Sequence, residues 1–323
     1  MARAAGLELA RDQFLEGRDG RALRRARDAG EKRRLVRGVY APTALWNSAS
    51  DDDRYLMQIK AVVLTRKSRP ILSHQSAARV WGLPIIGRWP REVHLVAEGP
   101  KAPRSKNGVA WHVGAVSDGE VVEIDGLLVT SRLRTMVDLA RTTGFVSAVA
   151  SLDAGIRQRF ALPDGRLVGD VSKEQLVEAA RALGTVRGCR RARTAAEFAD
   201  GLSGSPGESA SRANVFRAGM PAPVLQAQYA RPDGGDDIVD FSWDERHTVQ
   251  RRVLLGEYDG KVKYTRDQYL NGRTSDEVVW EEKVREDRLR EGGRDMVRWL
   301  WEDALSPSRL RAKLMKAGLR PER

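Results

Sequence analysis

The chain has 323 residues, 41% hydrophobic and 31% charged, a composition typical of a globular protein and unlike that of a disordered one. This length allows two or three domains, each large enough to bury its own core. The formal net charge is +12, mostly from arginine, which favours a polyanionic partner because the guanidinium binds phosphate through two hydrogen bonds. Arginine-rich codon usage would give the same composition, so clustering of the charges has to decide between the two explanations.

The few cysteines and histidines limit which disulfides and metal sites the chain can form. The single cysteine, Cys189, excludes an internal disulfide and a zinc site built on cysteines. The four histidines lack the spacing of metal ligands: His74, His94, His112 and His247. No apolar run is long enough to cross a membrane, and the first residues lack the apolar core of a signal peptide. We therefore expect a cytoplasmic protein with no membrane partner.

Residues 1–48 are predicted to form a winged-helix DNA-binding region. Helical patterns over Leu7–Leu15 and Arg21–Ala29 precede Leu35–Pro42, which alternates like a strand or hairpin. Two helices followed by a β wing is the order of a winged helix-turn-helix. Eight basic residues against two acidic ones give Arg21–Tyr40 a local net charge of +6. The residues expected to contact DNA phosphates are Arg24, Arg25, Arg33, Arg34 and Arg37. The alternative is a solvated, charged helix face.

Residues 49–200 are predicted to form an α+β module. Helices are expected at Tyr55–Thr65, after Ser73, and at Ser131–Arg141 and Val146–Gln158. Four strands are expected at Glu92–Ala97, Val109–Val113, Val121–Ile124 and Leu127–Thr130, the last two joined by an Asp-Gly turn. His74 begins a helix, and nothing in the sequence supplies it with a partner. We therefore assign it no function.

A segment rich in glycine, serine and proline, Ala199–Gly207, marks a domain boundary, so residues 201–323 form the third predicted domain. The whole chain is thus expected to be a multidomain protein of the α+β or α/β class. Within the third domain the predicted order is helix, three strands, long helix, strand and helix. The expected elements are Glu208–Ala218, Leu225–Tyr229, Asp237–Trp243, Val249–Tyr258, Ser275–Glu291, Asp295–Trp301 and Leu310–Ala317.

Acidic residues stand at three places in this domain, and we expect them to form one shared metal site: Glu208, Asp240 and Glu257. Asp240 lies within an apolar strand, and strict alternation would turn its side chain to the face opposite from both Val239 and Phe241. A buried carboxylate needs compensation, and a divalent cation supplies it. Oxygen ligands suit Mg²⁺ or Mn²⁺, whose bound water can attack a phosphodiester. The alternative is that Asp240 faces solvent on a half-exposed strand.

Several motifs of the C-terminal third resemble the very-short-patch-repair-like endonucleases of the PD-(D/E)xK superfamily. They are Ser205–Ser209, Gln226, Val239–Phe241, Glu257–Tyr264 and Lys283–Arg290, in this order, within about 205–305. The resemblance implies a restriction-endonuclease-like mixed sheet flanked by helices. It implies Asp240 and Glu257 as metal ligands and Glu208 as a supporting acid.

The lysine of this superfamily's acid-x-Lys motif is replaced here. Asp259 stands where the lysine belongs, two residues after Glu257, and the shifted match Asp259–Lys261 provides Lys261 instead. Lys263 stands where many relatives carry histidine. Asp259, Lys261 and Lys263 are therefore candidate catalytic residues, since a lysine can stabilise the phosphate in the transition state.

The long helix over Ser275–Glu291 is expected to place Lys283, Arg285 and Arg288 near the acidic residues, where they would hold a DNA phosphate. The alternative is that they pair with acidic residues on the helix surface, where Glu281 and Arg285 are four positions apart.

The front of the chain, over about 20–157, resembles the AbiEi type of antitoxin and transcriptional regulator. The resemblance lies in Leu35–Pro42, Leu72–Ala78, Trp81–Pro84, Val129–Ser131 and Met136–Ala140. It implies an N-terminal winged helix on operator DNA. In that toxin–antitoxin family the partner is a nucleotidyltransferase-like toxin.

Two functions fit these features. The first is a metal-dependent DNA endonuclease that the front region positions on DNA. The second is a non-catalytic transcriptional regulator or antitoxin whose nuclease fold is degenerate. A scaffold that binds only protein explains neither the basic wing nor the acidic residues.

Overall fold

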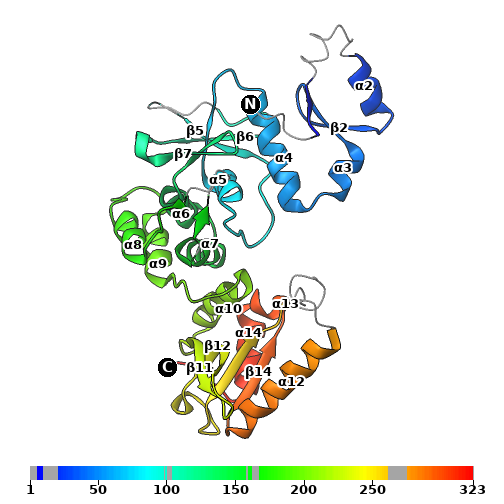
Figure 1. The fold of residues 1–323 in the computed structure, drawn as a ribbon. Coiled ribbons are helices and arrows are strands. Elements are labelled where there is room, and N and C mark those ends of the chain that lie inside the picture. The colour runs from blue at the N-terminus through cyan, green and yellow to red at the C-terminus, as the bar shows by residue number, and fades with distance from the viewer. Residues whose placement is uncertain are drawn as a thin grey trace. The chain divides into compact units, whose positions relative to one another are not determined.

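The computed structural model describes residues 6–9, 21–97, 99, 104–157, 159–161, 167–260 and 275–322. It contains both helices and β-sheets (Figure 1), which confirms the expected α+β character of the chain. Contacts divide the chain into two compact units, the first made of Met1–Thr143 with Gln158–Glu197 and the second of Gly144–Arg157 with Phe198–Arg323. The three domains expected from the sequence stay a prediction. In the described residues no helix has both the length and the apolar character needed to span a membrane.

The N-terminal part of the first unit is a small sheet with one described helix. Strands β1 (Glu8–Leu9), β3 (Val39–Pro42) and β2 (Lys32–Val36) pair antiparallel in that order, and α2 (Arg21–Asp28) precedes β2. The prediction of a helix over Leu7–Leu15 is wrong for Glu8 and Leu9, which form a strand, and the rest of this range from residue 10 on lies outside the described residues. Glu8 and Leu9 pair with Tyr40 and Val39, so contact with β3 overrides the local helical pattern.

Helices α3 (Thr43–Ser48) and α4 (Asp51–Leu64) follow the small sheet. Helix α4 begins before the expected Tyr55, because Ser50 caps it by accepting a 3.1 Å hydrogen bond from the Asp53 amide. Three aspartates in its first turn also favour a helix N-terminus.

The rest of the first unit is built on a five-stranded mixed sheet with strand order β6-β5-β4-β8-β7. Its strands are β4 (Ile71–Leu72), β5 (Val93–Ala97), β6 (Val109–Val113), β7 (Val121–Ile124) and β8 (Leu127–Thr130). The helices are α5 (His74–Trp81), α6 (Arg132–Thr142), α8 (Lys173–Arg181) and α9 (Cys189–Phe198), and β9 (Phe160–Ala161) pairs with β10 (Leu167–Val168). The four strands expected here are confirmed, and Asp125 and Gly126 take the positive φ values of their tight hairpin, 49° and 76°.

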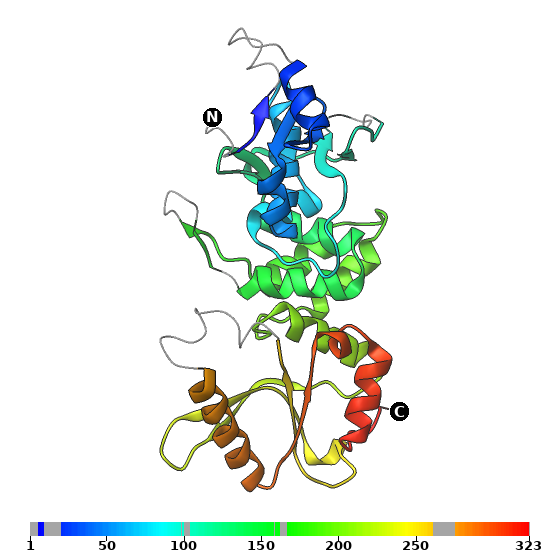
Figure 2. The same ribbon diagram turned by 90° about the vertical axis from the view of Figure 1, so that its right-hand side faces the viewer.

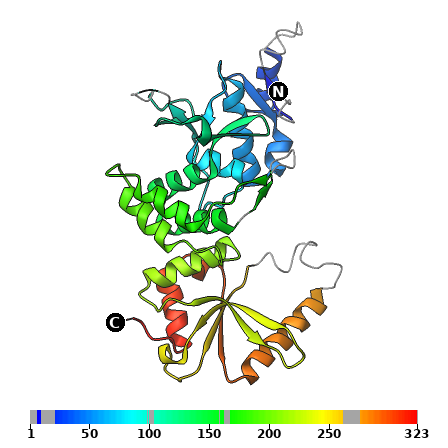
Figure 3. The same ribbon diagram turned by 60° about the vertical axis from the view of Figure 1, so that its left-hand side comes forward.

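The second unit is a four-stranded sheet covered by helices on both faces. The strands are β11 (Val224–Ala230), β12 (Asp236–Trp243), β13 (Leu254–Tyr258) and β14 (Asp295–Trp299), in that order. The first three run antiparallel, and β13 pairs parallel with β14. The helices are α7 (Phe145–Arg157), α10 (Pro206–Arg217), α12 (Ser275–Glu291), α13 (Trp301–Ala304) and α14 (Pro307–Lys316). Figures 2 and 3 show α12 on one face of the sheet and α14 on the other.

Two apolar clusters hold this sheet between its helices. On the α12 face Leu289 packs with Val239 and Leu255, whereas Phe241 and Trp299 pack on the other face with residues of α10 and α14. Gly256 allows the tryptophans to approach β13, because an added Cβ would lie 2.7 Å from Trp299 and 2.8 Å from Trp243.

Helix α7 joins the second unit through a buried ion pair. Arg212 of α10 donates from Nη2 to both carboxylate oxygens of Asp153, at 2.9 and 2.8 Å. Asp153 is fully buried, so this pairing is needed to compensate its charge. The sequence alone assigned α7 to the middle domain, because the two partners are far apart in the chain.

Candidate functional site

Asp240 and Glu257 lie where the pairing of β12 with β13 ends in the sheet of the second unit. The β12–β13 ladder ends at the pair Phe241 and Gly256, one residue before Asp240 would face Glu257. At this point the Tyr258 amide donates a 3.0 Å hydrogen bond to Asp240 Oδ2. A side chain of β12 therefore replaces a backbone carbonyl as the acceptor for β13. Burial is the main cause that raises the pKa of Glu257, and the charge of Asp240 adds to it. The two acidic residues predicted as ligands therefore lie close together.

Strand β12 is irregular at Asp240. Val239 packs on the α12 face of the sheet, but Phe241 packs on the opposite face with Trp299. The expectation that Asp240 points away from both neighbours is therefore wrong, because regular alternation is broken between them. The partner strand is irregular at the same level, where Gln226 has φ 48° and is missing from the register between Leu225↔Phe241 and Ala227↔Val239. Such local strain is common at functional sites.

Glu208 is positioned by the start of α10. Its Oε2 accepts hydrogen bonds from the Gly204 amide at 2.6 Å and from Gln226 Nε2 at 3.2 Å. Gly207 precedes it, and any side chain there would collide with the Tyr258 ring. Burial raises the pKa of Tyr258, and the charges of Glu208 and Asp259 raise it further, which places both carboxylates around this tyrosine. Glu208 thus lies near the end of β13 and also stabilises the turn before α10.

Two arginines pair with Glu257. Arg285 of α12 binds Glu257 Oε1 through Nη2 and the Ile238 carbonyl through Nη1 at 2.9 Å. Arg298 of β14 lies 3.6 Å from Glu257 Oε2. Both guanidinium groups also pair with Glu282. Burial opposes the charge of Arg285, but its bonds to Glu282 and Glu257 raise its pKa overall, so this network keeps the arginine charged.

The described residues do not form the three-carboxylate metal site expected from Glu208, Asp240 and Glu257. Among the residues that the structure describes, no group of three or more His, Cys, Asp or Glu side chains is arranged to hold a metal ion. Asp240 and Glu257 remain as two neighbouring carboxylates, one bonded to the Tyr258 amide and the other to two arginines. Mg²⁺ is commonly held in proteins by one or two carboxylates with water completing its shell. Asp259 lies 3.7 Å from Arg298. Lys261 and Lys263, the predicted catalytic lysines, lie outside the described residues.

The predicted DNA-binding residues fall into two groups. Those of the N-terminal region are exposed, and within the described part of the chain none forms an ion pair: Arg24, Arg25, Arg33, Arg34 and Arg37. Of the three predicted residues on α12, Lys283 is the one that is exposed and has no partner among the described residues. Arg288 binds both oxygens of Asp237 at 2.8 Å, and Arg285 pairs with Glu257 as described above. Both arginines are therefore already compensated by carboxylates.

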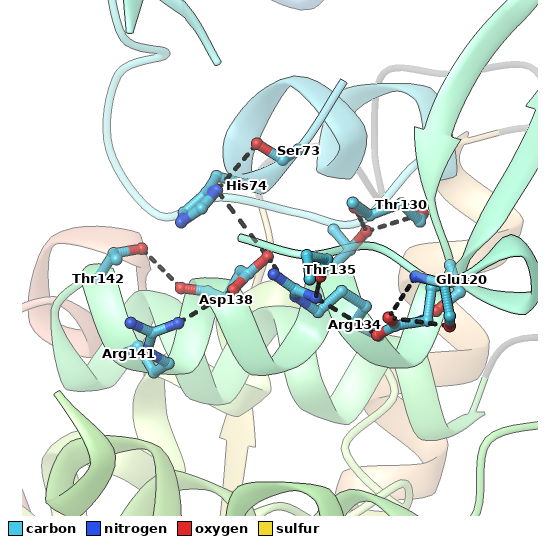
Figure 4. Close-up of polar contacts among 12 residues, drawn as sticks. Ser73, His74, Glu120, Thr130, Arg134, Thr135, Asp138, Arg141 and Thr142 are labelled. Carbon is cyan, nitrogen blue, oxygen red and sulfur yellow. Dashed lines mark hydrogen bonds and ion pairs between the residues drawn. The ribbon is translucent and has the colours of Figure 1, made fainter. Parts of the chain in front are cut away.

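His74 has the partners that the sequence did not reveal (Figure 4). Its Nδ1 lies 3.0 Å from Ser73 Oγ and 3.9 Å from Asp138 Oδ2. Asp138 is buried and accepts from Arg134 at 3.1 Å and from Arg141 at 3.4 Å. The expectation that His74 lacks a partner is wrong, because its partners come from elements distant in the sequence.

The His74 ring also stacks on two strand histidines. His112 lies 3.6 Å from it between ring centroids, and His94 Nδ1 lies 2.8 Å from His112 Nε2. Burial, together with the charge of His112, lowers the pKa of His74 to about 2 and that of His94 to about 4. The cluster is therefore neutral at pH 7. The sequence showed only that His94 and His112 lie in two predicted strands. These strands pair in parallel with His94 opposite Ala110 and His112 opposite Val96, which turns both histidines to the same face of the sheet.

The chain matches no protein-family model and no curated protein sequence. Among solved structures it is similar to the crystal structure of the RV2827C protein from Mycobacterium tuberculosis, at 16% identity and a TM-score of 0.38. The match covers 71% of this chain and 84% of that one. A similarity at this level supports no conclusion about fold or function.

Proposed function

We propose that this protein binds DNA and that its C-terminal unit is a PD-(D/E)xK-type domain that hydrolyses phosphodiester bonds with a divalent cation. The observation that carries the proposal is the proximity of Asp240 and Glu257 at the point where the pairing of β12 with β13 ends. The exposed arginines of a winged helix-turn-helix around α2, β2 and β3 supply the contacts to the DNA backbone.

Each residue of the acidic site has a distinct part in this proposal. Asp240 and Glu257 hold Mg²⁺ or Mn²⁺, which makes a bound water more acidic. Arg285 and Arg298 orient the Glu257 carboxylate, and the charge and hydrogen bond of Arg285 oppose its protonation by lowering a pKa that burial raises. Glu208 positions the start of α10 beside Tyr258. Lys261 or Lys263 stabilises the charge of the phosphate.

A second candidate function is a non-catalytic DNA-binding regulator, such as an AbiEi-type antitoxin with a nucleotidyltransferase-like toxin as partner. The specific observation in its favour is that Arg285 and Arg298 already compensate Glu257. The presence of Asp259 where the superfamily has lysine points the same way. In this case the arginines replace the cation, and the domain retains its fold without cleaving DNA.

A cleavage assay distinguishes the two candidates. The full-length protein is incubated with supercoiled plasmid and with nicked, mismatched and single-stranded DNA, in Mg²⁺, Mn²⁺ or EDTA. The proposal expects metal-dependent cleavage that Asp240→Asn abolishes. The matched control is Asp236→Asn, an exposed residue of the same strand, which should cleave normally. Retained DNA binding without cleavage of any substrate would establish the regulator, and loss of both activities would contradict both candidates.

A further inference from the structure

A hollow of about 400 Å³ lies in the first unit between β2, α3, α4 and the segment 88–91. Five arginines line it: Arg33, Arg34, Arg54, Arg88 and Arg91. Figure 1 shows β2, α3 and α4 next to one another at this end of the unit. The hollow therefore combines part of the predicted DNA-binding wing with residues of the following module, which the sequence did not connect with nucleic acid.

The charges in this hollow are strongly unbalanced. Asp51 is the acidic residue in its lining, and it pairs with Arg54 at 3.2 Å. The other four arginines have no carboxylate partner among the described residues. Converging guanidinium groups on a concave surface produce a strong positive potential and bind phosphate with two hydrogen bonds each. The hollow is thus suited to a phosphate group.

Two tryptophans add a stacking surface to the same hollow. Trp89 stacks on the buried Tyr55 at 5.0 Å between ring centroids, and its Nε1 donates a 2.7 Å hydrogen bond to Asp52. The guanidinium of Arg33 lies 4.8 Å above the ring of Trp46. These contacts hold both indoles in place, so little ordering is needed when a ligand arrives. Aromatic side chains beside a basic groove are the combination that binds unpaired bases.

We infer that this hollow binds one nucleotide unit, with its phosphate on the arginines and its base on a tryptophan. Its volume falls within the roughly 300–1,000 Å³ range of small-molecule sites. A base inside a duplex is covered on both faces by its neighbours, so the ligand is an unpaired nucleotide. It comes either from a single strand or from a free nucleotide, which share this chemistry. The inference is independent of the acidic site in the second unit.

The test compares two double substitutions of equal charge in the full-length protein. Arg88→Gln with Arg91→Gln removes two exposed arginines of the hollow, and Arg190→Gln with Arg191→Gln removes two exposed arginines of α9 as the control. Binding of a fluorescent twelve-residue oligothymidylate is measured by anisotropy at several salt concentrations. We expect at least a tenfold weaker affinity for the hollow variant and a salt slope flatter by about 1.4, as two lost phosphate contacts on a single strand predict.

The control variant should bind within about twofold of the wild type. Equal affinity of the two variants would overturn the inference. Competition with thymidine 5′-monophosphate then identifies the source of the ligand, because displacement of the oligonucleotide from the wild type shows that a free nucleotide suffices. Failure of the proposed function is recognised separately, since neither duplex binding by the wing nor plasmid cleavage depends on Arg88 and Arg91.

Discussion

Arginine has opposite surroundings in the N-terminal region of the first unit and in the second unit. In the N-terminal wing, Arg33, Arg34 and Arg37 are exposed and have no carboxylate partner within the described part of the chain. In the second unit, Arg212 and Arg285 are each bound to a buried carboxylate. The same residue type is therefore left without a carboxylate partner in one region and compensates a buried carboxylate in the other. Partners, and not the count of basic residues, decide which arginines are available for the proposed contacts to DNA.

The largest expected effect on stability comes from removing an arginine that pairs with a buried carboxylate. Arg212→Met leaves Asp153 buried without its partner, so we expect a loss of about 3–5 kcal/mol in the free energy of unfolding. Arg37→Met removes an exposed arginine and should change that free energy by less than about 0.5 kcal/mol. Denaturant unfolding measures both variants. Similar losses for the two would mean that pairing does not separate the two groups of arginines.

The wing arginines should show the reverse behaviour, with an effect on DNA affinity and none on stability. Joint replacement of Arg33, Arg34 and Arg37 by alanine should flatten the dependence of log affinity on log salt by roughly 2–3 units on duplex DNA. The measurement is a duplex titration at several salt concentrations, with the Arg190→Gln and Arg191→Gln variant as control. An unchanged slope would identify the wing cluster as a solvated surface.

A smaller effect is expected from pH on the first unit. Folding lowers the pKa of His94 to about 4, so keeping this histidine neutral contributes to the free energy of unfolding. The contribution is fully present above about pH 6.5 and is lost as the pH falls toward 4. Each such histidine contributes a slope of at most about 1.4 kcal/mol per pH unit. Asp138 acts in the other direction, since burial raises its pKa by more than the neighbouring Arg134 and Arg141 lower it.

Calorimetric melting between pH 7 and 4.5 checks this expectation. Replacing His94 and His112 by glutamine should reduce the acid-induced fall in melting temperature. His247→Gln, in the second unit, is the control and should leave the fall unchanged. If the double variant kept the full pH dependence, the histidine cluster would not be its source.

The sequence predicted local elements well where their ends carry local signals. Helix α10 begins at Pro206 after the cap Ser205, within two residues of the prediction, and the Asp125-Gly126 hairpin forms as expected. The strand expected from Val249 instead begins at Leu254, because Thr248 pairs with Leu319 and Arg251 has φ 56°. Neither of these last two features is encoded in the local pattern.

The candidate site was predictable only in part. Asp240 and Glu257 carry a local signal, a carboxylate within an apolar strand, and the structure places them together. Arg298 was missed because only the parallel pairing of β13 with β14 brings it opposite Glu257. The break in alternation at Asp240 was missed as well, because it depends on the irregular partner strand at Gln226.

The most direct test of the central claim is a cation titration of thermal stability. If Asp240 and Glu257 hold a divalent cation, millimolar Mg²⁺ or Mn²⁺ should raise the melting temperature of the second unit, because a ligand of the folded state stabilises it by mass action. Asp240→Asn should abolish this shift, and the exposed control Asp236→Asn should retain it. No shift in the wild type, or an equal shift in Asp240→Asn, would contradict the account of the acidic site.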